Sequence, residues 1–219
     1  METTGSTTSK ERPILFNAEM VKAILSGRKT QTRRIISEKT LHLFGVAASA
    51  GECHPLEMCD DRSQSYYVEF CPLGKSGDQL WVREAFQGPL VGESLLEEYR
   101  KNVERFETPK YCEYAADGGS KPEYLDLDDN LRQGWRPSIH MPRWASRINL
   151  LITGVRVERL QAITLGNICK EIGCSLYDFI PATYGFQVWE ELWKSIYGEE
   201  SWEANPWVWC ITFERMEAK

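Results

Sequence analysis

The sequence has no apolar run near the ~20 residues that a bilayer-spanning helix needs, so nothing in it supports a membrane role. It also has no excess of basic residues. The formal net charge is −6, which argues against a protein that coats long duplex DNA or RNA through many phosphate contacts. No secretory leader and no internal repeat are recognisable. These absences favour a soluble cytoplasmic protein and leave open a small ligand, or a few nucleotides, bound in a locally basic pocket.

Paired cysteines are absent as well, although the chain has seven. They are scattered along it at Cys53, Cys59, Cys71, Cys112, Cys169, Cys174 and Cys210. We therefore expect reduced thiols, as in the cytoplasm. Cys53, His54, Cys59 and Cys71 do not have the spacing of a zinc knuckle or ribbon. The sequence predicts neither a metal nor a cofactor.

The length of the chain suits one substantial domain with its own hydrophobic core. Residues 1–11 are small and polar, which predicts a disordered leader before a single domain over residues 12–215. Within that domain, residues 86–134 have the composition of a surface insertion that contains a charged helix, a short strand and an exposed acidic loop. We expect this insertion to be solvated surface.

Apolar periodicity predicts strands that outnumber helices. Helices are expected at residues 17–26, 164–173 and 185–197, and strands at residues 12–16, 32–36, 65–70, 78–85, 148–160 and 207–213. Residues 37–65 lack a sustained period and predict a loop or irregular hairpin. The helix at 185–197 has Val188, Trp189, Leu192, Trp193 and Ile196 on one face. The element order favours an α+β fold with a compact mixed β-barrel over a doubly wound parallel sheet.

The most distinctive segment is Gly27-Arg-Lys-Thr-Gln-Thr-Arg-Arg34, which follows a helix that Asn17 can cap. Gly27 suits the left-handed exit of that helix. Basic side chains at a helix C-terminus can simply complement the helix dipole. A lysine, two hydroxyls and three guanidinium groups in one turn also suit a ligand site. The segment is no phosphate-binding loop, because the upstream glycine is missing and the helix precedes it.

Gly27, Lys29 and Arg34 form the pattern Gly-x-Lys-x-x-x-x-Arg, and with it the chain resembles the ASCH domain family, a branch of the PUA-like β-barrels. Gly77-Asp78 before a strand is similar to the strand entry of that family. The tryptophan-rich segments 135–144 and 205–209 resemble the long ASCH proteins of bacteriophages and prophages. The resemblance covers residues 12–214 apart from the insertion and the 37–65 loop. It implies a PUA-like mixed β-barrel with flanking helices and a large surface insertion.

The resemblance also implies an association with RNA or modified nucleosides. Small bacterial members of the family include amidohydrolases that remove the acetyl group of N4-acetylcytidine, and their proposed catalytic set corresponds to Lys29, Thr32 and Glu171 here. Lys29 could remove the proton of the Thr32 hydroxyl if burial lowered its pKa. A charged Lys29 could instead stabilise the oxyanion while Glu171 activates water or protonates the departing amine. The sequence leaves both routes open.

Substrate capture needs a stacking surface and hydrogen-bond donors. The candidates are Arg28, Arg33, Arg34, His140, Arg143 and Trp144. A hydrogen-bonded structural histidine is an alternative for His140, and a structural ion pair is one for Arg143.

Four functions follow from these residues. The first is hydrolysis of the amide of N4-acetylcytidine or a related acylated nucleoside. The second is a non-catalytic module that binds short single-stranded RNA in the same pocket. The others are a phage accessory protein that binds a host protein through its acidic insertion, and a metal-independent ribonuclease.

Overall fold

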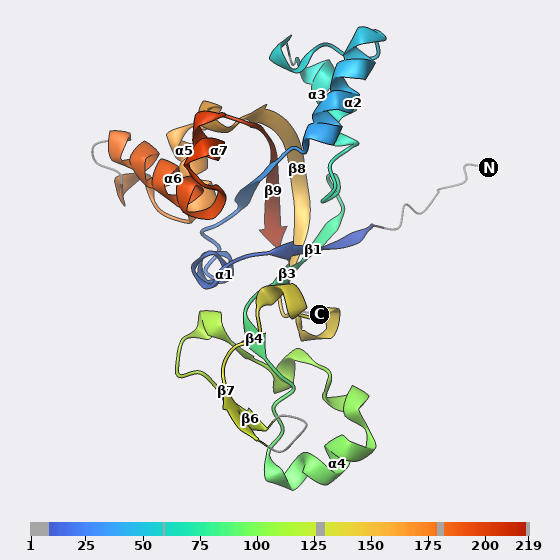
Figure 1. The fold of residues 1–219 in the computed structure, drawn as a ribbon, viewed down its shortest axis with the longest axis vertical. Coiled ribbons are helices and arrows are strands. Elements are labelled where there is room, and N and C mark those ends of the chain that lie inside the picture. The colour runs from blue at the N-terminus through green and yellow to red at the C-terminus, as the bar shows by residue number, and fades with distance from the viewer. Residues whose placement is uncertain (1–8, 59, 126–129, 179–181, 218–219) are drawn as a thin grey trace, which may run out of the picture.

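The structure, a computed structural model, describes residues 9–58, 60–125, 130–178 and 182–217 (Figure 1). The fold is α+β, as expected, and is built on a mixed sheet of five strands in the order β1-β3-β8-β9-β2. Only the β1–β3 pair is parallel. In chain order, these strands are β1 (Glu11–Leu15), β2 (Gln31–Ile35), β3 (Gln79–Arg83), β8 (Asn149–Arg159) and β9 (Trp207–Arg215).

Helices cover the sheet from two sides, with α5, α6 and α7 beside β2 and β9, and α2 and α3 near the far end of β8 (Figure 1). The helices are α1 (Ala18–Leu25), α2 (Glu38–Ser49), α3 (Asp61–Val68), α4 (Leu96–Lys101), α5 (Leu165–Ile172), α6 (Ala182–Tyr197) and α7 (Glu199–Glu203). Four short strands lie outside the main sheet: β4 (Phe86–Gln87), β5 (Glu113–Tyr114), β6 (Glu123–Leu125) and β7 (Leu131–Gln133).

The local signals around the first helix are confirmed. The Asn17 side chain accepts a hydrogen bond from the Met20 amide at 2.9 Å, and so caps α1. Gly27 follows the helix with φ +72°, in the left-handed region. The long strand with a break at Gly154 is also confirmed, because the β8–β9 register shifts between Ile152 and Gly154. A Cβ atom at Gly154 would lie 2.8 Å from the Thr212 hydroxyl, so a larger residue there would require the Thr212 side chain to move.

The loop or hairpin expected at residues 37–65 and the strand expected at residues 65–70 are wrong, because this region forms α2 and α3. The Ser37 side chain accepts from the Thr40 amide and begins α2. Phe44 and Ala47 are buried three residues apart, which is helical spacing. Small residues beside them weaken the apolar stripe, and this hid the period in the sequence.

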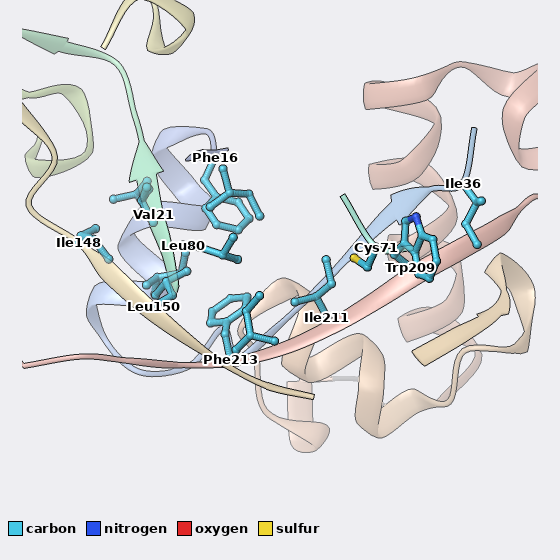
Figure 2. Close-up of a cluster of buried hydrophobic side chains, with 14 of the residues drawn as sticks. Phe16, Val21, Ile36, Cys71, Leu80, Ile148, Leu150, Trp209, Ile211 and Phe213 are labelled. Atoms are coloured by element: carbon cyan, nitrogen blue, oxygen red, sulfur yellow. The ribbon is translucent and has the colours of Figure 1, made fainter. Parts of the chain in front are cut away.

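The core of the sheet is formed by apolar side chains that point toward one another from α1, β3, β8 and β9 (Figure 2). Phe16, at the end of β1, packs against Phe213 with ring centroids 6.2 Å apart. Leu80 and Leu150 are fully buried. A second cluster lies under α5 and α6 and includes Trp189 and Trp193. The two clusters pack on opposite sides of β9, so each side of this strand is buried.

Residues 86–134 form a lobe beside the sheet, below it in Figure 1. The expected helix and strand of this insertion correspond to α4 and β5. Residues 126–129 of the expected acidic loop lie outside the described residues. Residues 1–8 of the expected leader also lie outside them. Arg147 joins the lobe to the sheet. Its guanidinium binds Glu84 through two contacts of 3.0 Å and Asp117 at 2.7 Å, over the ring of Tyr114.

The strands β1 and β2 are the two edges of the sheet, and no strand pairing joins them among the described residues. A side chain connects them instead, since an Arg34 Nη2 group donates to the Leu15 carbonyl at 3.0 Å. The turn that the sequence singled out therefore lies where the two edges approach each other.

Asp78 organises the entry to β3. Its carboxylate accepts from the Lys10 amide at 2.9 Å, the Lys75 amide at 3.2 Å and the Arg12 guanidinium at 3.1 Å. Gly74 is required beside it, because a Cβ atom there would lie 2.7 Å from the carboxylate. The Gly-Asp strand entry of the sequence thus joins the start of β1 to β3.

We expect Asp78→Asn to lower the free energy of unfolding by about 1 to 3 kcal/mol, because it removes a charged acceptor of three donors. Burial alone would raise the pKa of Asp78, but the hydrogen bonds from Lys10, Lys75 and Arg12 outweigh it and lower the pKa. A carboxyl group with a lowered pKa stabilises the fold above its ordinary pKa and loses that effect as the pH falls. Denaturant unfolding between pH 7 and pH 3 should therefore show a loss of stability below about pH 4, and this loss should be smaller in Asp78→Asn.

Glu69→Gln is the control for this variant. Glu69 pairs with Lys75 at 2.9 Å, but both side chains are more than half exposed, so little stability is expected from this contact. Equal effects of the two substitutions would contradict the role given to Asp78.

Candidate functional site

The candidate site forms where α5 lies along the outer edge of β2. The Thr30 amide donates to the Lys170 carbonyl at 3.0 Å, and the Arg33 amide donates to Glu171 Oε1 at 2.9 Å. An edge strand has outward N–H and C=O groups that need partners. Glu171 supplies one of these partners with its side chain. Its carboxylate is therefore fixed against the backbone of the 27–34 segment, which we call the signature turn.

Lys29 also links the edge strand β2 to Glu171 of α5. Its side chain is fully buried, and Nζ donates to the Gln31 carbonyl at 2.8 Å and to the Glu171 carbonyl, and lies 3.5 Å from Glu171 Oε1. Three acceptors match the three N–H groups of an ammonium. Burial is the main cause that lowers the pKa of Lys29; Glu171 opposes it, while Arg34 and Arg33 lower the pKa further.

Arg33 binds the same carboxylate from within the sheet. Its fully buried guanidinium donates to Glu171 Oε2 at 3.0 Å, to Gln31 Oε1 at 2.8 Å and to Glu158 Oε1 at 2.9 Å. The guanidinium also lies 5.8 Å from the ring centroid of Trp189. Lys29, Arg33, Glu158 and Glu171 thus form a buried network of two cations and two carboxylates.

A cavity of about 390 Å³ lies beside this network, between the end of β1, β2, α5 and α6. Glu171, Arg33, Arg34 and Ser138 contribute its polar wall. The rest of the wall is mainly apolar or aromatic and includes Phe16, Trp189, Leu192, Trp193, Ile196 and Tyr197. A mostly apolar cavity with a few convergent polar groups is typical of small-ligand sites.

Thr32 and Arg34 alternate with Gln31 and Arg33 along β2, so they lie on its other face. An Arg34 Nη1 group donates to Thr32 Oγ1 at 2.7 Å, and the guanidinium lies 5.4 Å from the ring centroid of Phe16. Arg34 lines the cavity, whereas Thr32 is fully buried and does not. The structure therefore brings Lys29 and Glu171 together and joins Thr32 to the cavity wall through Arg34.

The remaining four predicted site residues lie outside the wall of the 390 Å³ cavity. Arg28 donates to the Gly173 carbonyl at 2.9 Å and lines a smaller cavity of about 260 Å³ that Glu171 also lines. Arg143 pairs with Glu11 at 2.6 Å and with Asn149 at 2.9 Å, on the β1–β3 side of the sheet. Trp144 packs against the cluster around Phe86, and His140 is exposed. None of these four side chains lines the 390 Å³ cavity, although the segment that contains His140, Arg143 and Trp144 contributes Ser138 to it.

Sequence reasoning missed the role of α6 and of two polar residues. The stripe of Trp189, Leu192, Trp193 and Ile196 was visible as a helix face, but nothing in the sequence indicated that it would form the wall of a cavity. Gln31 and Glu158 bind the guanidinium of Arg33, and no motif marks either of them. The Glu158 contact is long-range and is set by strand register, which a single sequence does not specify. The Gln31 contact is local, because Gln31 and Arg33 lie two residues apart on β2.

Cys210 lies opposite Arg33 in the β2–β9 register. Burial raises the pKa of Cys210 to about 12, so the thiol stays protonated at neutral pH and is no thiolate nucleophile. Across the described ranges, we find no group of three or more His, Cys, Asp or Glu side chains placed to hold a metal ion. No helix in the described part of the chain is long and apolar enough to cross a membrane.

No family model, no curated protein and no solved structure matches this chain.

We expect Arg33→Met to lower the free energy of unfolding by roughly 3 to 5 kcal/mol, because it leaves buried carboxylates without their main partner. Glu171→Gln should lower the free energy of unfolding less in the Arg33→Met variant than in the wild type, because Arg33 and Glu171 bind each other. Urea unfolding of the four proteins of this double-mutant cycle measures both effects.

Arg156→Met is the matched control, because Arg156 binds the same Glu158 at 2.9 Å but is about one third exposed. A partly exposed pair should contribute no more than about 1 kcal/mol. If Arg33→Met were no more destabilising than Arg156→Met, the network would not support the fold as described.

Proposed function

We propose that the protein hydrolyses the amide of N4-acetylcytidine or a related acylated nucleoside, as an ASCH-type member of the PUA-like superfamily. The observation that carries this proposal is the Glu171 carboxylate, which lines the cavity and has Lys29 and Arg33 directly behind it. The side-chain link from Arg34 to Leu15 at the open edges of the sheet is consistent with a barrel-like arrangement of the PUA type.

In the proposed reaction, the Glu171 carboxylate removes a proton from a water molecule, and the water oxygen attacks the carbonyl carbon of the amide. The C–N bond then breaks, and Glu171 returns the proton to the departing amine nitrogen. The products are the free carboxylic acid and cytidine. The positive charge of Lys29, Arg33 and Arg34 offsets the negative charge that develops on the carbonyl oxygen.

This geometry favours the water route over attack by the Thr32 hydroxyl. Thr32 does not line the cavity, and its oxygen accepts a hydrogen bond from Arg34. In the proposal, Glu171 is the catalytic residue. Lys29 and Arg33 are positioning residues that hold its carboxylate, and Thr32 holds Arg34 at the cavity wall.

Purified protein should release cytidine from N4-acetylcytidine, measured by chromatography of the products. Glu171→Gln should lower kcat/KM by at least ~100-fold, the usual scale for loss of an acid–base group. Glu214→Gln is the control, because Glu214 is exposed on β9 and away from the cavity. Thermal unfolding of each variant reports on the fold. Absence of hydrolysis of both N4-acetylcytidine and its monophosphates by the wild type, or full activity of Glu171→Gln, would rule out the hydrolase.

A second candidate is a module that binds a nucleoside or short single-stranded RNA without turnover. It is favoured by one observation: the three N–H groups of the Lys29 ammonium already have acceptors within the protein, as in a structural lysine. Ligand binding without cytidine release in the same assay would support it. Absence of binding at low salt would count against it.

A further inference from the structure

Arg34 is the guanidinium of the cavity wall that has no acidic partner. Its three hydrogen bonds go to neutral oxygens: Thr32 Oγ1 at 2.7 Å, the Arg33 carbonyl at 2.9 Å and the Leu15 carbonyl at 3.0 Å. A guanidinium has five N–H groups, so two of those of Arg34 have no hydrogen-bond acceptor in the part of the chain that the structure describes. Among the described residues, no carboxylate forms an ion pair with Arg34, whereas Arg33 beside it has two.

The surroundings of Arg34 make this unpaired charge significant. Phe16 lies under the guanidinium, and the neighbouring cavity wall is mostly apolar, so water compensates the charge less well than at an exposed site. The charged side chains that line the cavity are Arg33, Arg34 and Glu171, and Arg33 and Glu171 bind each other. The cavity wall therefore has an excess of one positive charge, located at Arg34.

The rest of the cavity suits a flat apolar group. Trp189 and Trp193 belong to α6, with ring centroids 5.6 Å apart, and both line the cavity with Tyr197. Aromatic rings of this kind can stack on a nucleobase. A ligand that satisfies both features has a planar base at one end and an oxyanion at the other.

We infer that the cavity takes an anionic nucleotide, whose phosphate accepts hydrogen bonds from the two free N–H groups of Arg34 while its base lies against the aromatic side chains of α6. The inference rests on the proposed function and deepens it: the substrate is an acylated nucleotide rather than a neutral nucleoside. An oxyanion could also come from an apolar carboxylate, so the experiment includes both sources.

Binding is measured at low salt by isothermal titration with cytidine, its 5′- and 3′-monophosphates, and benzoate. The wild type should bind one of the monophosphates roughly ten- to hundredfold more tightly than cytidine, as expected for hydrogen bonds to a charged group. In Arg34→Met, the ratio of the dissociation constants of cytidine and that monophosphate should fall close to one. Arg34→Lys keeps the charge but lacks the planar set of guanidinium donors, so it should reduce this ratio several-fold. This variant tests the inference if Arg34→Met fails to fold.

Arg215→Met is the matched control. Arg215 also donates to a backbone carbonyl, that of Leu25 at 2.9 Å, but it is exposed and does not line the cavity. Its removal should leave the preference for the monophosphate unchanged.

Equal binding of cytidine and both monophosphates by the wild type would overturn the inference. So would a preference that survives in Arg34→Met and Arg34→Lys, or Arg34-dependent binding of benzoate but of neither monophosphate. Failure of the proposed function is distinguishable: N4-acetylcytidine hydrolysis without a phosphate preference refutes only the anionic substrate. A phosphate preference without hydrolysis of N4-acetylcytidine or its monophosphates refutes only the hydrolase.

Discussion

The contact between Glu171 and the outer edge of β2 is the interaction on which the site depends. One carboxylate accepts the Arg33 amide, binds the Arg33 guanidinium and lies 3.5 Å from the Lys29 ammonium. It therefore covers an edge strand, docks α5 and brings three charged groups together. Loss of this carboxylate would expose backbone groups and leave two buried cations with fewer partners. Stability and any chemistry at this position are consequently coupled.

The polar residues of the 27–34 segment differ in whether they reach the cavity. Lys29 and Thr32 are buried and do not line the cavity, whereas Glu171 and Arg34 do. The 27–34 segment thus separates into an inner part, which binds α5 to the sheet, and an outer part, which lines the cavity. In the proposed function, one motif serves the fold at some positions and the ligand at others.

Features that depend on neighbouring residues were predictable from the sequence. Asn17, Gly27 and the break at Gly154 act within one turn or one strand, and the structure has them as expected. The helices α2 and α3 were missed, because small and polar residues such as Gly45 and Ser63 interrupt their apolar period. The approach of Glu171 to Lys29 came from family resemblance. The contact of Glu158 with Arg33 depends on pairing across three strands, β2, β9 and β8, which local patterns do not encode. Gln31 lies two residues before Arg33 on the same strand, so its contact follows from β2 alone.

The distribution of charge explains how an acidic protein can have a cationic cavity. Residues 86–134 contain eleven acidic and six basic residues, so the insertion accounts for −5 of the net charge of −6. The remaining chain is nearly neutral, and its basic groups can dominate locally at the signature turn. Screening limits the field of exposed charges to about 10 Å at moderate salt. The potential inside the cavity is therefore set by Arg34 and its immediate neighbours, and an acidic pI is compatible with the proposed binding of a single phosphate there.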